Sequence, residues 1–175
     1  MNICVFCSAN NVGAEYMDAA RELGRWIGRE GHTLVYGGAN LGLMEEVARS
    51  AHKYGATVVG VVPAILEKTG RASDCIDVRI LCDNLNDRKA LMIDKSDAIV
   101  ALPGGVGTLD EIFTVAAAAS IGYHHKRVVL YSVGGFWQPL LDMLAAMKGQ
   151  GVLRDGLEAS LPVAHTLDEV AACIG

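Results

Sequence analysis

The sequence predicts an α/β fold of the Rossmann-like type, a three-layer sandwich with a central parallel sheet and helices on both faces. Short apolar strands and longer amphipathic helices alternate along all 175 residues, which is the order that repeated βαβ units produce. The strands, such as ICVFC at 3–7 and AIVAL at 98–102, are nearly continuous apolar runs, typical of a parallel sheet covered on both faces. No linker or internal repeat interrupts the pattern, so residues 1–175 are expected to form one domain.

The first half of the chain predicts three strands, two helices and a long loop. Apolar runs at 3–7, 33–36 and 57–62 predict the strands, and Gly37 and Pro63 end the second and the third. Helices are expected over 14–30 and 41–54, where residues such as Leu23, Ile27 and Val47 recur at helical spacing. Residues 64–76 are polar and irregular, so the longest loop is expected there.

The second half predicts three more strands and four helices. The strands are expected at 78–81, 98–102 and 127–132, and the first three helices at 85–95, 107–121 and 136–148. A last helix is expected over 167–174, where Thr166 and Glu169 have the spacing of a capping box.

Composition limits the class of protein and the compartment. The net charge is −5, which argues against a nucleic-acid partner because phosphate backbones favour a basic face. No apolar stretch approaches the roughly 20 residues of a membrane span, and the N-terminus lacks the basic start of a signal peptide. Five cysteines, an odd number, suggest thiols in a reducing compartment, and we expect a cytoplasmic protein. Cys4 and Cys7 form a C-x-x-C, but a strand directs them to opposite faces, which disfavours a metal or redox pair.

Small, polar or glycine residues follow four of the predicted strands. Because ligands of open α/β sheets bind beyond the carboxyl ends of the strands, these residues are candidates for ligand contact, Ser8 and Gly38 among them. The four sets are Ser8–Asn10, Gly37–Asn40, Pro63 and Pro103–Thr108.

The segment PGGVGTLDE at 103–111 is the most specific of these sets. It follows an apolar strand and opens a helix, whose first N–H groups are unpaired and attract an anion. We expect Gly104, Gly105 and Gly107 to bring backbone N–H groups close to the ligand, with Val106 between them and Thr108 adding a hydroxyl. The segment lacks the Lys of a Walker A loop and does not read G-x-G-x-x-G. It therefore predicts a site for one phosphate, as in a mononucleotide.

Charged residues near this loop indicate chemistry. Glu111 shares a helix face with Gly107 and Thr108, where a carboxylate does not help phosphate binding, and the helix N-terminus is expected to keep it ionised. Arg88 begins a helix at the same edge and is expected to bind the phosphate or orient Glu111. Lys89 is equally a substrate contact or a solvated residue. Asp110 is expected to be a solvated partner of the helix dipole.

RKALM at 88–92, SDAIVALPGGVGTLDE at 96–111 and LVYGGANLGLM at 34–44 together resemble the LONELY GUY family. These are cytokinin-activating phosphoribohydrolases, and many members once carried the label "lysine decarboxylase". The resemblance implies hydrolysis of the N-glycosidic bond of nucleoside 5′-monophosphates, cytokinin nucleotides and often AMP, to free base and ribose 5-phosphate. It also implies a homodimer with active sites near the dimer interface, and no metal or organic cofactor.

The family motif assigns roles to named positions. Arg88 and Glu111 match the catalytic pair, Gly105–Thr108 match the phosphate loop, and Lys89 matches a substrate contact. No residue is an obvious acid for the leaving base, Asp87 being the one suggestion. The sequence departs from the family on the base side, where Glu45 replaces a common Gly and Ala117–Ala118 replace a Thr-Trp pair of the plant enzymes. Because these departures lie on the base side, they leave the identity of the base open, more than the type of reaction.

Three alternatives accompany this interpretation. Related folds bind nucleotides or molybdenum cofactor without turnover. A pyridoxal-phosphate decarboxylase needs a Schiff-base Lys, but Lys89 belongs to the R-K motif and the chain is short for that class. A purely structural interaction protein does not need the paired phosphate loop and carboxylate. Release of adenine from AMP separates the hydrolase from a binding protein, and the absence of a visible cofactor absorbance dismisses the decarboxylase.

Overall fold

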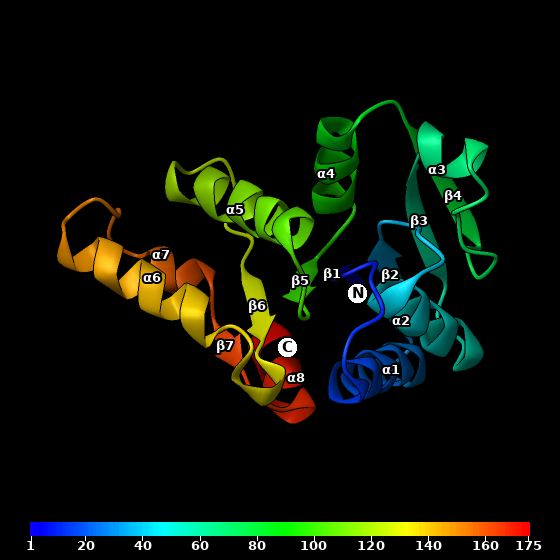
Figure 1. The fold of residues 1–175 in the computed structure, drawn as a ribbon, viewed down its shortest axis with the longest axis horizontal. Coiled ribbons are helices and arrows are strands. Elements are labelled where there is room, and N and C mark those ends of the chain that lie inside the picture. The colour runs from blue at the N-terminus through cyan, green and yellow to red at the C-terminus, as the bar shows by residue number, and fades with distance from the viewer.

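The computed structural model describes all 175 residues and confirms the predicted architecture. Seven parallel strands form one sheet in the order β4-β3-β2-β1-β5-β6-β7, with helices on both faces (Figure 1). The strands are β1 (Asn2–Phe6), β2 (Thr33–Tyr36), β3 (Val58–Pro63), β4 (Val78–Cys82), β5 (Ala98–Ala101), β6 (Val128–Tyr131) and β7 (Val163–Ala164).

The helices divide between the two faces of the sheet. Residues of α1, α2 and α8 pack in one apolar cluster, and residues of α4, α5, α6 and α7 pack in the other. Figure 1 shows the two layers on opposite sides of the strands. The helices are α1 (Ala14–Arg29), α2 (Gly42–Lys53), α3 (Ala64–Lys68), α4 (Leu85–Asp94), α5 (Val106–Ser120), η1 (Val133–Gly135), α6 (Gln138–Gly149), α7 (Leu157–Ser160) and α8 (Leu167–Ile174). None of them is both long and apolar enough to cross a membrane.

Alternation along β1 sends its side chains into both clusters. Ile3 and Val5 join the cluster under α1 and α2, whereas Phe6 lies in the cluster under α4 and α5. Cys7 joins the first cluster and Cys4 the second. The C-x-x-C is therefore split by the sheet, as the period of a strand predicts.

The order of the strands places a crevice beside β1. The chain adds β2, β3 and β4 on one side of β1 and then crosses to place β5 on its other side. Beyond the carboxyl ends of β1 and β5 lies the topological switch point, where open α/β sheets bind their ligands. Residues 8–10 and 103–108 follow these two strands.

Residues 64–76 were expected to be an irregular loop, which is wrong in part. Pro63 precedes the five-residue helix α3, and the following residues return along the turn after β2. There Asn40 donates its N–H to the Arg71 carbonyl at 2.9 Å, and Ser73 donates to the Gly38 carbonyl at 2.9 Å. This region is ordered by hydrogen bonds between segments that lie far apart in the chain. Hydrophobic periodicity does not detect such bonds.

The C-terminal region holds two elements that the sequence did not predict. They are α7, with four residues, and β7, with two, and both are too short for a periodic signal. The capping prediction is confirmed, since the Thr166 side chain accepts a hydrogen bond from the Glu169 N–H at 3.2 Å.

Candidate functional site

The turn after β1 ties three elements together at the switch point. Ser8 donates its N–H to the Pro103 carbonyl at 3.1 Å, and its own carbonyl accepts from Leu43 and Met44 at the start of α2. The Ser8 hydroxyl accepts from the Asn10 N–H at 3.0 Å. The segments after β1 and β5 and the N-terminus of α2 therefore meet at Ser8, as their positions after the strands predicted.

The loop after β5 presents free backbone donors. The N–H groups of residues 104–108 donate no hydrogen bond, and the first N–H of α5 with a partner is that of Leu109, which bonds to the Gly105 carbonyl. Gly105, Val106 and Gly107 are exposed, and a Cβ added at Gly105 or Gly107 would meet no atom within 4 Å. Free donors at an open helix N-terminus are the arrangement that binds a phosphate.

Gly104 has a different role from the one expected. A Cβ at this position would overlap the side chain of Thr108, which is buried against it. Gly104 therefore makes room for Thr108 within the protein, whereas Gly105 and Gly107 leave room for a ligand.

Glu111 is a buried carboxylate in the second turn of α5. Its exposed fraction is 5%, and no protein group donates a hydrogen bond to its side chain. Burial raises its pKa to about 7, while the nearby positive charge of Arg88 lowers it, the Asp110 charge raises it and the Lys89 charge lowers it. The expectation that the helix N-terminus keeps Glu111 ionised is therefore wrong, because the cost of desolvating the carboxylate exceeds the benefit of the helix N-terminus.

Arg88 reaches across the site from α4 to the turn after β2. Its Nη2 donates to the Gly37 carbonyl at 2.9 Å, and its buried Nε has no partner. A Cβ on Gly37 would overlap the Arg88 guanidinium. Arg88 and Glu111 form no direct ion pair, although the guanidinium charge acts on the Glu111 pKa. The guanidinium therefore keeps N–H donors available beside Glu111.

Lys89 and Asp110 form an ion pair between α4 and α5. The Lys89 Nζ donates to both Asp110 carboxylate oxygens, at 2.9 and 2.8 Å. The side chain of Lys89 is only 15% exposed, so of its two alternatives the solvated residue is wrong. The side chain of Asp110 is 53% exposed, as expected of a solvated residue, but it also pairs with Lys89. The sequence contains no signal for this pair because its two residues lie on different helices.

Two further candidate residues, Gly38 and Asp87, lie near this edge of the sheet. Gly38 has a φ of +77° and is buried against Val62, so its glycine is required by the backbone, and its carbonyl is used by Ser73. Asp87 is exposed and accepts a hydrogen bond from Asn84 in the N-terminal cap of α4, which favours a capping role for it.

Gly37 is the site residue that sequence reasoning identified only as part of a set. Its specific role, leaving space for a guanidinium 51 positions further along the chain, becomes visible in the structure. The one available signal was the Gly-Gly pair directly after a buried strand. No group of three or more His, Cys, Asp or Glu side chains in the structure is placed to hold a metal ion.

Comparison with known proteins identifies a family model and sequence relatives that match most of the chain. Residues 44–174 match the family model described as "Possible lysine decarboxylase". The rice (Oryza sativa subsp. japonica) cytokinin riboside 5′-monophosphate phosphoribohydrolase LOG is 39% identical over 172 residues, covering 96% of this chain and 70% of the relative. The Mycobacterium tuberculosis protein of the same enzyme name is 36% identical over 172 residues, covering 98% and 92%.

Solved structures share the fold over the same length. The Moco carrier protein from Chlamydomonas reinhardtii superimposes with a TM-score of 0.70 at 27% identity, covering 99% of this chain and 94% of that one. The sequence relatives are more similar to this chain than this structural neighbour, and they are similar over nearly its whole length. The chain belongs to the LONELY GUY family of cytokinin riboside 5′-monophosphate phosphoribohydrolases.

Proposed function

We propose that the protein hydrolyses the N-glycosidic bond of nucleoside 5′-monophosphates, cytokinin riboside monophosphate or AMP, to a free base and ribose 5-phosphate. The observation that carries this proposal is Glu111, a buried carboxylate with a pKa of about 7 directly behind a loop of free N–H donors. A carboxylate in that place weakens simple anion binding, so its presence favours catalysis. The names of the rice and mycobacterial relatives support the same reaction.

The phosphate of the nucleotide binds at the N-terminus of α5. The donors are the backbone N–H groups of Gly104, Gly105, Val106, Gly107 and Thr108, which have no partner within the protein. The helix dipole adds a partial positive charge there. Lys89, paired with Asp110, lies nearby, and Ser8 and Gly38 line the neighbouring turns.

Glu111 acts at the ribose. The C1′–N bond breaks, its electron pair leaves with the base, which takes up a proton from solvent, and C1′ acquires oxocarbenium character. The carboxylate stabilises this cation and takes a proton from the attacking water as the new C1′–O bond forms. Glu111 later returns this proton to solvent, so that the reaction balances. A pKa of about 7 suits this role, because a base acts most efficiently when its pKa is near the working pH.

Arg88 stays protonated and does not donate a proton. Its contact with the Gly37 carbonyl fixes one end of the guanidinium, and its buried Nε has no partner within the protein. We assign it to orienting the nucleotide and Glu111.

A homodimer is proposed from the apolar surface beside the site. Exposed apolar side chains lie at the start of α5, in the turn after it and on α6, and a groove of about 390 Å³ between α5 and α6 is mostly apolar. An exposed apolar groove marks an interaction surface. A second copy on this face agrees with the active sites near the dimer interface that the family resemblance implies. The exposed apolar residues are Val106, Ile121, Tyr123, Met143 and Met147.

A cytoplasmic location is proposed from the cysteines. All five are free, and three of them are buried. Free thiols persist in a reducing compartment. No cofactor is invoked in the reaction.

The second candidate function is carriage of molybdenum cofactor without turnover. The likeness to the Moco carrier protein at 27% identity favours it. The buried Glu111 argues against it, because a carrier of an anionic pterin gains nothing from a carboxylate behind its phosphate site.

The test is a panel of AMP, GMP, CMP, UMP and an N6-prenylated AMP, with adenosine as the control that lacks phosphate. Free base is measured by chromatography and ribose 5-phosphate by a coupled assay. We expect base and sugar phosphate in equal amounts from at least one monophosphate and none from adenosine. Nucleotide binding by calorimetry without base release from any monophosphate would show a carrier instead.

A further inference from the structure

The helix α4, which carries Arg88 and Lys89, packs few apolar side chains against the rest of the protein. Only Met92 and Ile93 of α4 are buried, and Leu85 at its start is exposed. At its C-terminal end, Lys126 donates to the Ile93 carbonyl. Its N-terminal half, where Arg88 and Lys89 lie, receives little support from apolar packing.

Two side-chain contacts connect this N-terminal half to the rest of the site. Arg88 bonds to the Gly37 carbonyl after β2, and Lys89 bonds to Asp110 on α5. No other side-chain hydrogen bond or ion pair joins α4 to α5. The Lys89–Asp110 pair is therefore the one polar link between the helix that carries Arg88 and the helix that carries Glu111.

The geometry of this link suits a positioning role. Both oxygens of the Asp110 carboxylate accept from one ammonium group, at 2.9 and 2.8 Å, which fixes its position more closely than a single contact. Asp110 precedes Glu111 in the chain, so the link is anchored beside the carboxylate proposed to act on the ribose. A negative side chain is also favoured near the N-terminus of a helix.

We propose that Asp110 is a positioning residue, which holds Lys89 on α4 against the start of α5 and so keeps Arg88 opposite Glu111. This inference rests on the proposed function, because its consequence for rate needs the reaction to occur. Asp110 touches neither substrate nor reacting atoms; it acts through Lys89. A loosened α4 misplaces Arg88 by fractions of an ångström to an ångström, and errors of that size cost about 10- to 100-fold in rate.

The link contributes little to stability. Asp110 is about half exposed, and exposed pairs contribute little to the free energy of unfolding. We therefore expect Asp110→Asn to impair the reaction while leaving the melting temperature within about 2 °C of the wild-type value.

A pH profile provides a readout that a merely structural residue would not change. The charged and titratable groups around Glu111 are Arg88 and Lys89 from α4, its neighbour Asp110, and the buried thiols of Cys4 and Cys7 from β1. The Asp110 charge raises the Glu111 pKa and the Lys89 charge lowers it. Removing the Asp110 charge and freeing the Lys89 charge therefore both lower the Glu111 pKa. The acidic limb of kcat/KM is expected to move to lower pH in Asp110→Asn and to return in Asp110→Glu.

The experiment compares Asp110→Asn with Asp94→Asn as the matched control, because Asp94 is an exposed carboxylate at the end of α4 with no ion pair. With AMP or the best substrate of the panel, we expect kcat/KM to fall about 10- to 100-fold in Asp110→Asn, to recover in part in Asp110→Glu and to stay within about twofold in Asp94→Asn. In a cycle with Lys89→Met, the double variant is expected to be no slower than Lys89→Met alone. A wild-type rate in Asp110→Asn would overturn the proposal. So would a double variant whose loss of rate equals the product of the losses in Asp110→Asn and Lys89→Met.

Hydrogen exchange separates this proposal from the proposed function. Amides of α4 are expected to exchange about tenfold faster in Asp110→Asn than in Asp94→Asn or wild type. If the wild-type protein releases no base but α4 loosens in this way, the proposed function fails and the link stands. If α4 exchanges at the wild-type rate in Asp110→Asn, the link is wrong whatever the activity.

Discussion

The layer of α1 and α2 and the layer of α4 and α5 cover opposite faces of the same sheet, and they are held in different ways. Between α1 and α2 the backbones almost touch, since a Cβ on Gly24 would overlap the Val47 carbonyl and one on Gly28 would lie 2.8 Å from the backbone of Tyr54. The Ser50 hydroxyl adds a bond to the Arg21 carbonyl at 2.6 Å. In contrast, α4 buries two residues and is linked to α5 by one ion pair.

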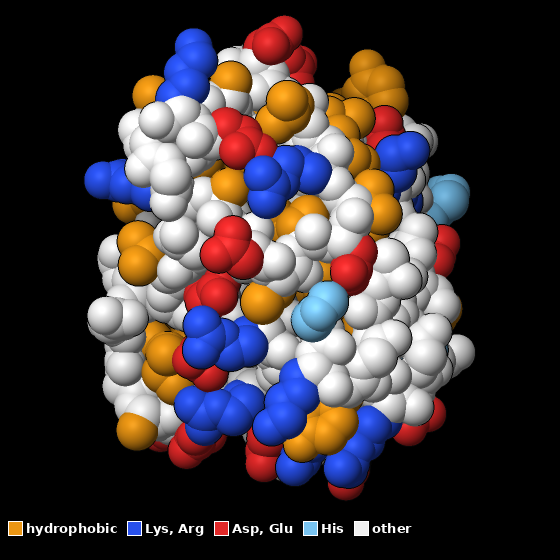
Figure 2. Space-filling view, turned by 90° about the vertical axis from the view of Figure 1, so that its right-hand side faces the viewer, with side chains coloured by type: hydrophobic (Ala, Val, Ile, Leu, Met, Phe, Trp, Pro, Cys, Tyr) orange, Lys and Arg blue, Asp and Glu red, His pale blue; other side chains and the backbone are white.

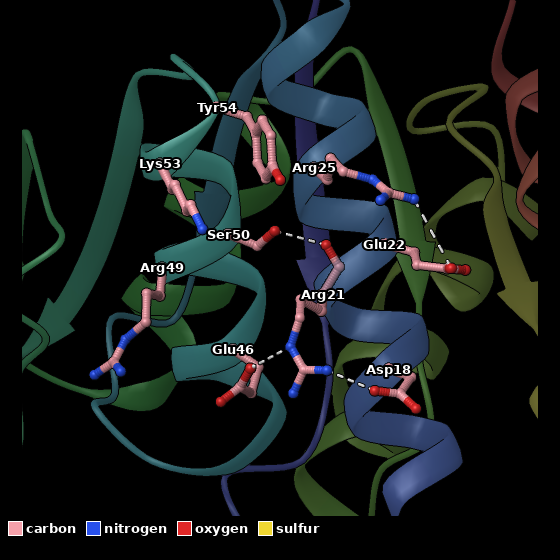
Figure 3. Close-up of a pocket in the computed structure, with 9 residues that line it drawn as sticks. All are labelled: Asp18, Arg21, Glu22, Arg25, Glu46, Arg49, Ser50, Lys53 and Tyr54. Atoms are coloured by element: carbon pink, nitrogen blue, oxygen red, sulfur yellow. Dashed lines mark hydrogen bonds and ion pairs between the residues drawn. The ribbon is translucent and has the colours of Figure 1, made fainter.

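The charged residues of the two layers also differ in how many of them have partners within the protein. Figure 3 shows a pocket of about 540 Å³ over α1 and α2, where Arg21 lies between Asp18 and Glu46 at 2.5 and 3.2 Å. The lower part of Figure 2, over these helices, shows basic and acidic side chains interspersed. The last turns of both helices carry basic residues such as Arg29 and Lys53, which complement the helix dipoles. Arg21, Arg25 and Arg49 each form an ion pair with a carboxylate of α1 or α2.

At the other face, charged groups are buried and incompletely satisfied. Glu111 has no hydrogen-bond donor within the protein, and Arg88 Nε is buried without a partner. A protein retains such groups where a ligand completes them. One face of the sheet therefore supplies stability, while the other gives up stability for a reactive site.

Among substitutions outside the catalytic carboxylate, the largest expected effect on activity comes from Gly37→Ala. The added methyl group displaces the Arg88 guanidinium, so we expect kcat/KM to fall about 10²- to 10³-fold, as when one stabilising donor is lost. The melting temperature should change little, because Arg88 is able to move toward solvent. Gly13→Ala is the control, since a Cβ there meets no atom within 4 Å. Normal activity in Gly37→Ala would show that the position of Arg88 is unimportant.

The same substitution on the other face should damage the fold. In Gly24→Ala the methyl group forces α1 away from α2, at a cost of about 2–3 kcal/mol in the free energy of unfolding. The activity of the folded fraction should remain near wild type, because Gly24 faces Val47 and Ser50 in the middle of α2, away from the N-terminus of α2 that contacts Ser8. Urea unfolding measures the loss, with Gly149→Ala as the unhindered control. A Gly24→Ala protein with full stability but impaired turnover would contradict the division of roles.

Glu111→Gln should stabilise the protein in a pH-dependent way. The folded pKa of about 7 lies above the reference value of 4.5, so the folded state binds more protons than the unfolded state between these values. Wild-type stability therefore falls as pH rises through this window. We expect Glu111→Gln to gain about 2–3 kcal/mol at pH 8 and little at pH 4.5, measured by urea unfolding at both pH values. An equal gain at both would show that packing, and not charge burial, makes the difference.

The smallest effect is expected at the paired charges of Figure 3. Arg21 is about half exposed, and its bonds to Asp18 and Glu46 lie at the surface. Arg21→Ala should cost less than about 1 kcal/mol and leave turnover unchanged. The loss should shrink further in 0.5 M salt, which screens exposed pairs. A large loss of turnover in this variant would place a function in the α1–α2 pocket.

The sequence predicted the elements that have a strong periodic signal. The buried strands near 3–7 and 98–102 and the helix over 14–30 appear within a few residues of their expected positions. The elements that were missed, α3, α7 and β7, have two to five residues and depend on contacts made after the chain folds.

For the site, sequence reasoning identified the loop at 103–111 and the positions of Arg88 and Glu111, because glycine spacing and helix register are local properties. It did not anticipate the state of Glu111, the use of Gly37 or the partner of Lys89. Each of these depends on burial or on residues brought together from different strands and helices. Desolvation in particular cannot be judged until the surrounding structure is known.

Whether Glu111 is the catalytic carboxylate is tested by base release from AMP, or from the best substrate of the panel, by wild type and Glu111→Gln over pH 5–9. We predict a wild-type kcat/KM that rises with pH and levels off above about 7, as Glu111 loses its proton. We predict that Glu111→Gln is about 10³-fold slower or less active still and has lost this limb, while it still binds the nucleotide. Base release by Glu111→Gln at the wild-type rate and with the wild-type profile would contradict the assignment of Glu111 as the catalytic carboxylate.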